Sequence, residues 1–168
     1  MTRPIVSSAH LVSEGAAELS EFEFGLMIAH GAFSRWIVRC MTAAGVPDVS
    51  ALDVMVLHSI NHRNREKRIG DVCLVLNVED THLVSYALRK LERLGLVSRR
   101  RRGKEVFYAA TEAGQDACRR YREVREACLI EALSALGGID NAEIGGLARA
   151  LRALSGLYDQ AARSAASL

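Results

Sequence analysis

Five positive charges occupy the six positions from Arg99 to Lys104, in the run RRRRGK, which only Gly103 interrupts. The whole chain of 168 residues has a formal net charge of only +2, so its positive charge is concentrated in this run. Clustered guanidinium and ammonium groups neutralise phosphates and release condensed counterions, which gives an affinity that falls steeply with salt. The run therefore predicts contact with a polyanion that carries a phosphate backbone.

Other residue types that could do chemistry form no catalytic or metal-binding pattern. His58 and His62 are spaced i, i+4, as some metal ligands are, but no glutamate follows His58 and no third ligand can be identified. The chain contains no glycine-rich phosphate loop and no Ser-His-Asp signature. No CxxC pair is present, and we interpret the cysteines as small buried hydrophobic residues: Cys40, Cys73, Cys118 and Cys128. We predict no enzymatic activity, no metal site and no cofactor.

The composition indicates a folded and mostly helical protein. Hydrophobic residues make up 49% of the chain and charged residues 25%, an ordinary globular balance. Only two prolines occur, which favours long helices over many short strands. No apolar run approaches the ~20 residues needed to cross a bilayer. The N-terminus also lacks a basic segment followed by an apolar stretch, so we expect a cytoplasmic protein without membrane contact.

The spacing of apolar residues predicts long helices near both ends of the chain. Steps of three and four over residues 19–40 indicate one helix that ends near Gly45. Thr111 is typical of the start of a fifth helix, which the glycines at 137 and 138 break. The segment 140–143, DNAE, has the pattern of a capping box and starts a last amphipathic helix.

A helix-turn-helix is predicted between these long helices. Ser50 followed by Asp53 is typical of a helix start, and the second helix then runs to about residue 61. A polar loop, NHRNREKR, and a short third helix that ends at Asn77 follow. The fourth helix ends at Gly95, and its polar face carries Thr81, His82, Ser85, Arg89 and Arg93. Its apolar face consists of Val84, Ala87, Leu88, Leu91 and Leu94.

Two short segments after the fourth helix predict a β-hairpin that carries the basic run. Residues 96–101 form the first segment, and residues 105–110 form the second, which is rich in the types that strands prefer. Gly103 lies at the bend, where a positive φ costs a glycine little. The hairpin therefore places positive charge along its first strand and at its tip.

Residues 52–114 resemble the winged helix-turn-helix of the MarR family of bacterial transcription regulators. The matching stretches are HLVSYALRKLERLGLVSRR, the hairpin, or wing, and ATEAGQDA, which is similar to the LTxxG pattern that opens the family's fifth helix. The resemblance implies a mainly α fold with a small β-hairpin wing and with dimerisation helices at both ends of the chain. It also implies a homodimer that binds pseudo-palindromic DNA with half-sites roughly 10 base pairs apart.

On this basis we expect four parts in the chain. An N-terminal arm covers residues 1–17, a dimerisation helix 18–46, the winged helix-turn-helix DNA-binding domain 48–111, and the C-terminal dimerisation helices 112–168.

The resemblance also implies two sets of contacts with double-stranded DNA. The fourth helix would approach base edges and nearby phosphates through Thr81, His82, Ser85 and Arg89. The wing would contact the minor groove or the backbone through Arg100, Arg101, Arg102 and Lys104. Tyr86 stands where relatives often have a basic residue. The wing is shorter than in many relatives and lacks the acid that often precedes an arginine there, so other groups must brace it.

A small aromatic acid or other phenolic effector is a further partner that the resemblance suggests. It would bind between the dimerisation helices and the DNA-binding lobe and lower the affinity for DNA. Phe33, Trp36 and Cys40 are candidates to line such a cleft, although their spacing equally suits core or dimer contacts. We therefore expect a ligand-responsive, sequence-specific transcription regulator. The alternative is a dimeric winged-helix module that binds a protein partner and has no operator of its own, but arginine at the wing tip favours DNA.

Overall fold

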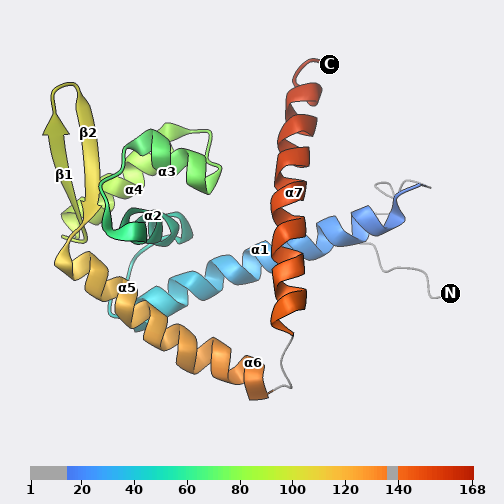
Figure 1. The fold of residues 1–168 in the computed structure, drawn as a ribbon, viewed down its shortest axis with the longest axis horizontal. Helices are drawn as coiled ribbons and strands as arrows, with labels where there is room; N and C mark the ends of the chain where they lie inside the picture. The colour runs from blue at the N-terminus through green and yellow to red at the C-terminus, as the bar shows by residue number, and fades with distance from the viewer. Residues whose placement is uncertain (1–14, 136–139) are drawn as a thin grey trace. The chain divides into compact units, whose positions relative to one another are not determined.

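The computed structural model describes residues 15–135 and 140–168, which divide into two units at Arg125 and Glu126. The first unit contains α1 (Ala17–Ala43), α2 (Ala51–Asn61), the 3-10 turn η2 (His62–Asn64), α3 (Ile69–Leu76), α4 (Thr81–Arg93), β1 (Val97–Arg102), β2 (Glu105–Ala110) and α5 (Glu112–Arg125). The second contains the π-helical turn η3 (Glu126–Ile130), α6 (Glu131–Ala135) and α7 (Asn141–Ala165). The mainly α fold with a small hairpin is thereby confirmed (Figure 1).

Residues 1–14 of the expected arm and the predicted helix break at 137 and 138 lie outside the described residues. Within the described ranges, no helix is long and apolar enough to cross a membrane.

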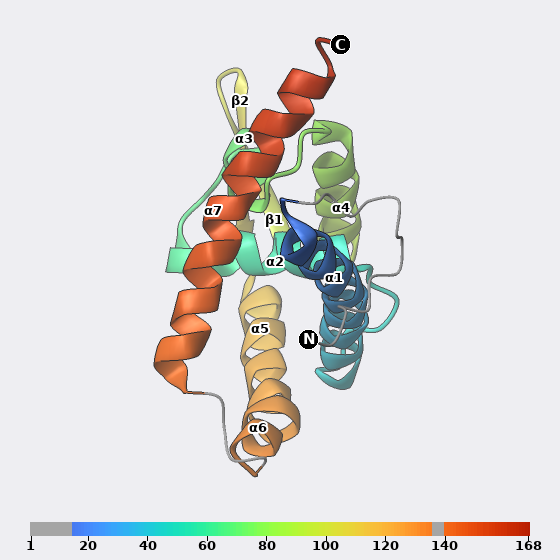
Figure 2. The same ribbon diagram turned by 90° about the vertical axis from the view of Figure 1, so that its right-hand side faces the viewer.

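Helix α2 lies at the centre of the first unit and packs against α1, α3, α4 and α5 (Figures 1 and 2). The predicted capping box starts it: Asp53 N donates to Ser50 Oγ at 3.1 Å, and Ser50 N donates to the Asp53 carboxylate at 2.7 Å. The same carboxylate pairs with Lys90 Nζ of α4 at 2.9 Å, and the Asp53 side chain is only 4% exposed. One buried acid therefore both starts α2 and ties α4 to it.

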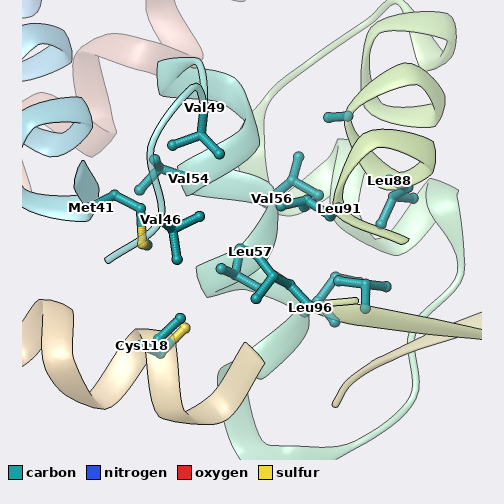
Figure 3. Close-up of a cluster of buried hydrophobic side chains, with 14 of the residues drawn as sticks. Met41, Val46, Val49, Val54, Val56, Leu57, Leu88, Leu91, Leu96 and Cys118 are labelled. Atoms are coloured by element: carbon teal, nitrogen blue, oxygen red, sulfur yellow. The ribbon is translucent and has the colours of Figure 1, made fainter. Parts of the chain in front are cut away.

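Side chains from α1, α2, α4 and α5 meet in one hydrophobic core. Figure 3 shows Leu57 of α2 between Cys118 of α5 and Leu91 of α4, with Met41 of α1 nearby. The predicted apolar face of α4 is confirmed, except at Leu94, which is 46% exposed. Leu94 follows the last helical residue, and Gly95, with φ 73°, then turns the chain away, so Leu94 leaves the buried face.

The cysteines divide between the two units. Cys40, Cys73 and Cys118 are buried, as predicted, and burial raises the pKa of the Cys118 thiol to about 11. The prediction is wrong for Cys128, which is exposed because it lies in η3, a turn without buried residues.

The hairpin pairs β1 with β2 in antiparallel register, from Val97 opposite Ala110 to Arg102 opposite Glu105. Gly103 has φ 60° at the bend, as its position predicts. An unexpected third segment joins the edge of β2. The backbone of Lys67 exchanges hydrogen bonds of 2.9 and 2.8 Å with that of Tyr108. The polar loop after α2 is therefore attached to the wing.

A close approach between the start of α5 and Leu96, the residue before β1, generates the first prediction. A Cβ added at Gly114 would overlap the carbonyl oxygen of Leu96, whereas one added at Gly70 in α3 would meet nothing within 4 Å. We expect Gly114→Ala to lower the free energy of unfolding by about 1–3 kcal/mol, because the crowded backbone must shift. Urea unfolding measures this change.

The matched control is Gly70→Ala, which replaces a helical glycine in open space. It should leave the stability unchanged or raise it by up to about 1 kcal/mol. Equal destabilisation by both substitutions would contradict the close approach at Gly114.

Candidate nucleic-acid interface

Helix α4 presents a continuous polar face to solvent. Its N-terminus is fixed by Asp80, whose carboxylate accepts a 2.8 Å hydrogen bond from the His82 backbone. Four buried residues hold the opposite face in the core: Val84, Ala87, Leu88 and Leu91. The predicted contact residues consequently share the outward side. Three of them, Thr81, His82 and Arg89, are exposed, and Ser85 is half-buried.

Tyr86 belongs to the same outward face, although the sequence prediction did not include it among the contacts. Its side chain is 63% exposed. It follows His82 by four residues and precedes Arg89 by three, so helical geometry places all three on one face. This spacing alone could have identified Tyr86 as an outward-facing residue from the sequence.

The wing is braced from outside the hairpin, by two acids that precede it in the chain. Glu66, in the loop after α2, lies 3.7 Å from Arg100 Nη1 and 2.6 Å from Arg102 Nη2. Glu92 of α4 lies 3.6 Å from Arg99 Nε. The expectation that other groups replace the missing acid of the wing is therefore met. Sequence reasoning missed Glu66, although it is the only acid in the run NHRNREKR.

Arg101 and Lys104 differ from these arginines in their partners. Arg101 Nε donates to the Gly103 carbonyl oxygen at 3.1 Å. The side chains of Arg101 and Lys104 are both exposed. Within the described residues, neither cation has a carboxylate within ion-pair distance. The four predicted wing contacts thus consist of two internally paired arginines and two unpaired cations at the tip.

A buried lysine holds the loop that carries Glu66. Lys67 is 6% exposed, and its Nζ donates to the carbonyl oxygens of Ser59, Ile60 (3.3 Å) and His62 (2.8 Å) at the end of α2. Burial, followed by the charges of Arg65 and Arg63, lowers the pKa of Lys67. The predicted polar loop is therefore buried at this position, because the last carbonyl groups of α2 need hydrogen-bond donors.

A cavity of about 600 Å³ lies beside this loop. It is lined by Phe33, Ile37, Val54, Met55, His58, Ser59, His62, Arg63, Arg65, Lys67, Val75, Leu76 and Tyr121. Of the residues predicted to line an effector cleft, Phe33 is therefore included. Trp36 and Cys40 are not: Trp36 packs against the core, and Cys40 is 1% exposed, with Sγ donating to the Tyr121 carbonyl oxygen at 3.4 Å.

The lining of the cavity combines an apolar wall with polar groups that lack partners. Ser59 is 8% exposed, and its Oγ, like His58 Nε2, is buried without a hydrogen-bond partner in the described part of the chain. The His58 ring meets that of Tyr121 edge-on at 4.5 Å between centroids. Burial lowers the pKa of His58. The guanidinium groups of Arg63 and Arg65 add positive charge, so the cavity suits an aromatic molecule with an anionic group.

Metal ligation has no comparable support. Nowhere in residues 15–135 or 140–168 do three His, Cys, Asp or Glu side chains come together as a metal site requires.

Comparisons with known proteins agree with this geometry. Residues 49–114 match the family model of a winged helix DNA-binding domain, whereas curated protein sequences give no match. A MarR family regulator from Neisseria meningitidis has a TM-score of 0.67 at 14% identity, with 85% of this chain and 94% of that chain covered. A mutant of MarR from E. coli complexed with operator DNA has a TM-score of 0.66 at 19% identity, with 84% and 99% covered. CouR from Rhodococcus jostii RHA1 bound to p-coumaroyl-CoA has a TM-score of 0.61 at 18% identity, with 79% and 90% covered.

Residues 49–114 are therefore similar to the winged helix DNA-binding domain, which is the part of the chain that contains α2, α3, α4 and the hairpin. The fold of the chain over most of its length is that of the MarR-family regulators, as the sequence resemblance predicts.

The lowered pKa of His58 generates a prediction about stability and pH. The unfolded chain protonates this histidine near its ordinary pKa of 6.5, but the folded chain protonates it only at lower pH. The free energy of unfolding should therefore decrease as the pH falls from 7 towards 5. His58→Phe keeps a ring against Tyr121 but cannot titrate, so it should flatten this decrease. Urea unfolding across the pH range measures both slopes.

Above pH 7 the neutral form of His58 prevails in both states, and the stability difference between the two proteins should be constant there. Parallel curves for the wild type and His58→Phe between pH 7 and 5 would contradict the prediction.

Proposed function

We propose that the protein is a transcription regulator of the MarR type, which binds pseudo-palindromic operator DNA as a homodimer and responds to a small aromatic anion. The observation that carries the proposal is the outward face of α4 together with a wing that presents two cations, Arg101 and Lys104, which have no carboxylate partner among the described residues. A helix of this kind fits the major groove, and tip cations fit the adjacent backbone or minor groove.

Each set of residues has a separate role in this proposal. Thr81, His82, Ser85 and Arg89 read base edges, because they occupy the exposed N-terminal two turns and the middle of α4. Arg101 and Lys104 bind phosphates, so they raise the affinity for DNA of any sequence to the same extent. Arg100 and Arg102 are both paired with Glu66. They contact phosphates only when they leave Glu66, or when they bind Glu66 and a phosphate at the same time.

Homodimer formation is supported by apolar side chains that a single chain leaves exposed in each unit. In α1 these are Leu19, Leu26, Met27, Ile28 and Phe33, which are between 37% and 63% exposed. In α7 they are Ile144, Leu147, Leu151 and Leu157, which are between 37% and 60% exposed. Exposed large apolar side chains that recur along a helix favour an interaction site. A second copy of the chain is the partner that also accounts for a two-fold operator.

Effector binding is supported by the cavity beside the α2–α3 loop. Ser59 Oγ and His58 Nε2, which have no hydrogen-bond partner in the described part of the chain, offer hydrogen bonds, and Arg63 and Arg65 offer positive charge to an anionic group. CouR, with the same fold, is bound to p-coumaroyl-CoA. An effector lowers DNA affinity only if it binds the DNA-incompetent arrangement more tightly.

The test of DNA binding separates the reading helix from the wing. We expect Arg101→Ala with Lys104→Ala to weaken binding to specific and random duplexes alike and to lower the slope of log Kd against log salt by about 2 per wing. Arg89→Ala should instead reduce the preference for the specific duplex, roughly 10-fold or more, because a bidentate base contact contributes about 1–3 kcal/mol. Fluorescence anisotropy across a salt series measures both.

The specific duplex is the region upstream of the protein's own coding sequence, and a random duplex of equal length is the competitor. Sedimentation of the complex should give two chains per duplex. If the wild type binds neither duplex at low salt, the protein-partner alternative replaces this proposal.

The test of effector binding uses the unusual backbone of Arg63, which has φ 61° and ψ 17°. Glycine adopts this conformation without strain, so Arg63→Gly removes the guanidinium at little conformational cost. With p-coumarate as the probe, we expect Arg63→Gly to weaken binding about 10-fold or more, since a hydrogen bond to a charged group contributes about 1.5–3 kcal/mol. Isothermal titration calorimetry measures the affinity.

The uncharged amide of p-coumarate provides the matched control, because it keeps the ring and loses the charge. Its affinity should change little between the wild type and Arg63→Gly. An unchanged affinity for p-coumarate in Arg63→Gly would remove Arg63 from the proposed site.

A further inference from the structure

Glu66 holds two arginines of the wing at once, from a segment outside the wing. Arg100 and Arg102 are two residues apart on β1, so their side chains extend from the same face of the hairpin. The two side chains are 69% and 55% exposed, whereas the side chain of Glu66 is only 26% exposed. The carboxylate thus lies beneath two guanidinium groups whose outer sides face solvent.

The position of this carboxylate is fixed by its neighbour. Lys67 is buried, and its ammonium group donates hydrogen bonds to carbonyl oxygens at the end of α2. Its backbone exchanges two hydrogen bonds with Tyr108 of β2. The backbone of Glu66 therefore cannot move outward with the arginines without breaking this attachment. A phosphate that approaches the wing must therefore compete with Glu66 for Arg100 and Arg102.

We propose that Glu66 is a specificity-determining residue, an internal counter-ion that limits the attraction of the wing for DNA of any sequence. The proposal rests on the DNA-binding function proposed above. Phosphate contacts strengthen binding to all sequences alike, and non-specific sites vastly outnumber operators. A wing in which Glu66 already partly neutralises Arg100 and Arg102 gains less from random DNA. Only a duplex that α4 also binds keeps its phosphates beside the wing long enough to displace Glu66 from Arg100 and Arg102, or to share these arginines with it.

A counter-ion and a simple brace predict opposite changes in DNA affinity when the charge of Glu66 is removed. If Glu66 only kept the hairpin in place, removing its charge would loosen the wing and weaken binding to DNA. If it is a counter-ion, removing its charge releases two arginines and strengthens binding to random DNA. Glu66→Gln keeps the shape and one acceptor oxygen, so it removes the charge with the least change in packing.

We expect Glu66→Gln to bind a random duplex about three- to tenfold more tightly at low salt. The slope of log Kd against log salt should become steeper by about 1–2 per wing, since each added phosphate contact contributes about 0.9 to the slope. The preference for the upstream duplex over the random one should fall. Fluorescence anisotropy of the full chain gives all three quantities, and thermal unfolding of the same samples reports the stability of the fold.

Glu105→Gln is the matched control, because it removes the same charge from an acid that lies on the hairpin itself. Glu105 forms an ion pair with Arg68 at 2.8 Å. Although it lies opposite Arg102 in the strand register, it forms no ion pair with Arg100 or Arg102 within the described residues, so its effect on random DNA should be much smaller. In a background of Arg100→Gln with Arg102→Gln, Glu66→Gln should also have little effect.

The outcomes separate this inference from the proposed function. Weaker binding of Glu66→Gln to random DNA, with or without a lower melting temperature, would overturn the counter-ion role in favour of a brace. An effect equal to that of Glu105→Gln, or one that persists without the two arginines, would reduce Glu66 to general charge repulsion and overturn it too. A wild-type protein that binds no DNA would overturn the proposed function and this inference together.

Discussion

The arrangement of the first unit depends on the burial of one ammonium group. Lys67 Nζ satisfies carbonyl oxygens at the end of α2, where no intrahelical donor remains for them. Burying a cation is unfavourable unless such partners surround it, so the segment that carries Lys67 must pass against the end of α2. From there its backbone reaches Tyr108 and joins the wing. The helix, the cavity and the hairpin consequently share one short segment of chain.

Helix α2 is therefore tied at both ends to the elements that would meet DNA. At its start, the Asp53 carboxylate binds Lys90 of α4, and at its end, Lys67 connects it to β2. The cavity lies against the last turns of α2, where Ser59 and His58 contribute to the lining. A molecule in the cavity that shifts α2 or its loop would act on α4 and the wing together. Coupling of this kind requires only that the two arrangements bind the molecule with different affinity.

The sequence predicts those features that depend on neighbours within a few residues. Helix α4, the cap at Ser50 and the bend at Gly103 follow from periodicity and turn chemistry, and the outward contacts of α4 follow from the helix itself. Features that depend on distant partners were missed. The run around Glu66 looks like a solvated loop until Arg100, Arg102 and Tyr108 are brought beside it. Trp36 and Cys40 share the apolar periodicity of Phe33, but spacing alone does not distinguish a cavity wall from a core.

The same long-range pairing accounts for the concentration of charge in a chain with a net charge of only +2. A bare run of five cations would bind any polyanion, and the tightness of that binding would reduce the preference for a particular sequence. In the fold, acids outside the run pair with Arg99, Arg100 and Arg102, while Arg101 and Lys104 at the tip have no such partner within the described residues. The positive charge that reaches solvent unopposed is consequently smaller than the run suggests and lies at the end of the hairpin. In the proposed function, such a surface would derive its selectivity from α4, and Arg100 and Arg102 would add affinity only when a phosphate displaces Glu66.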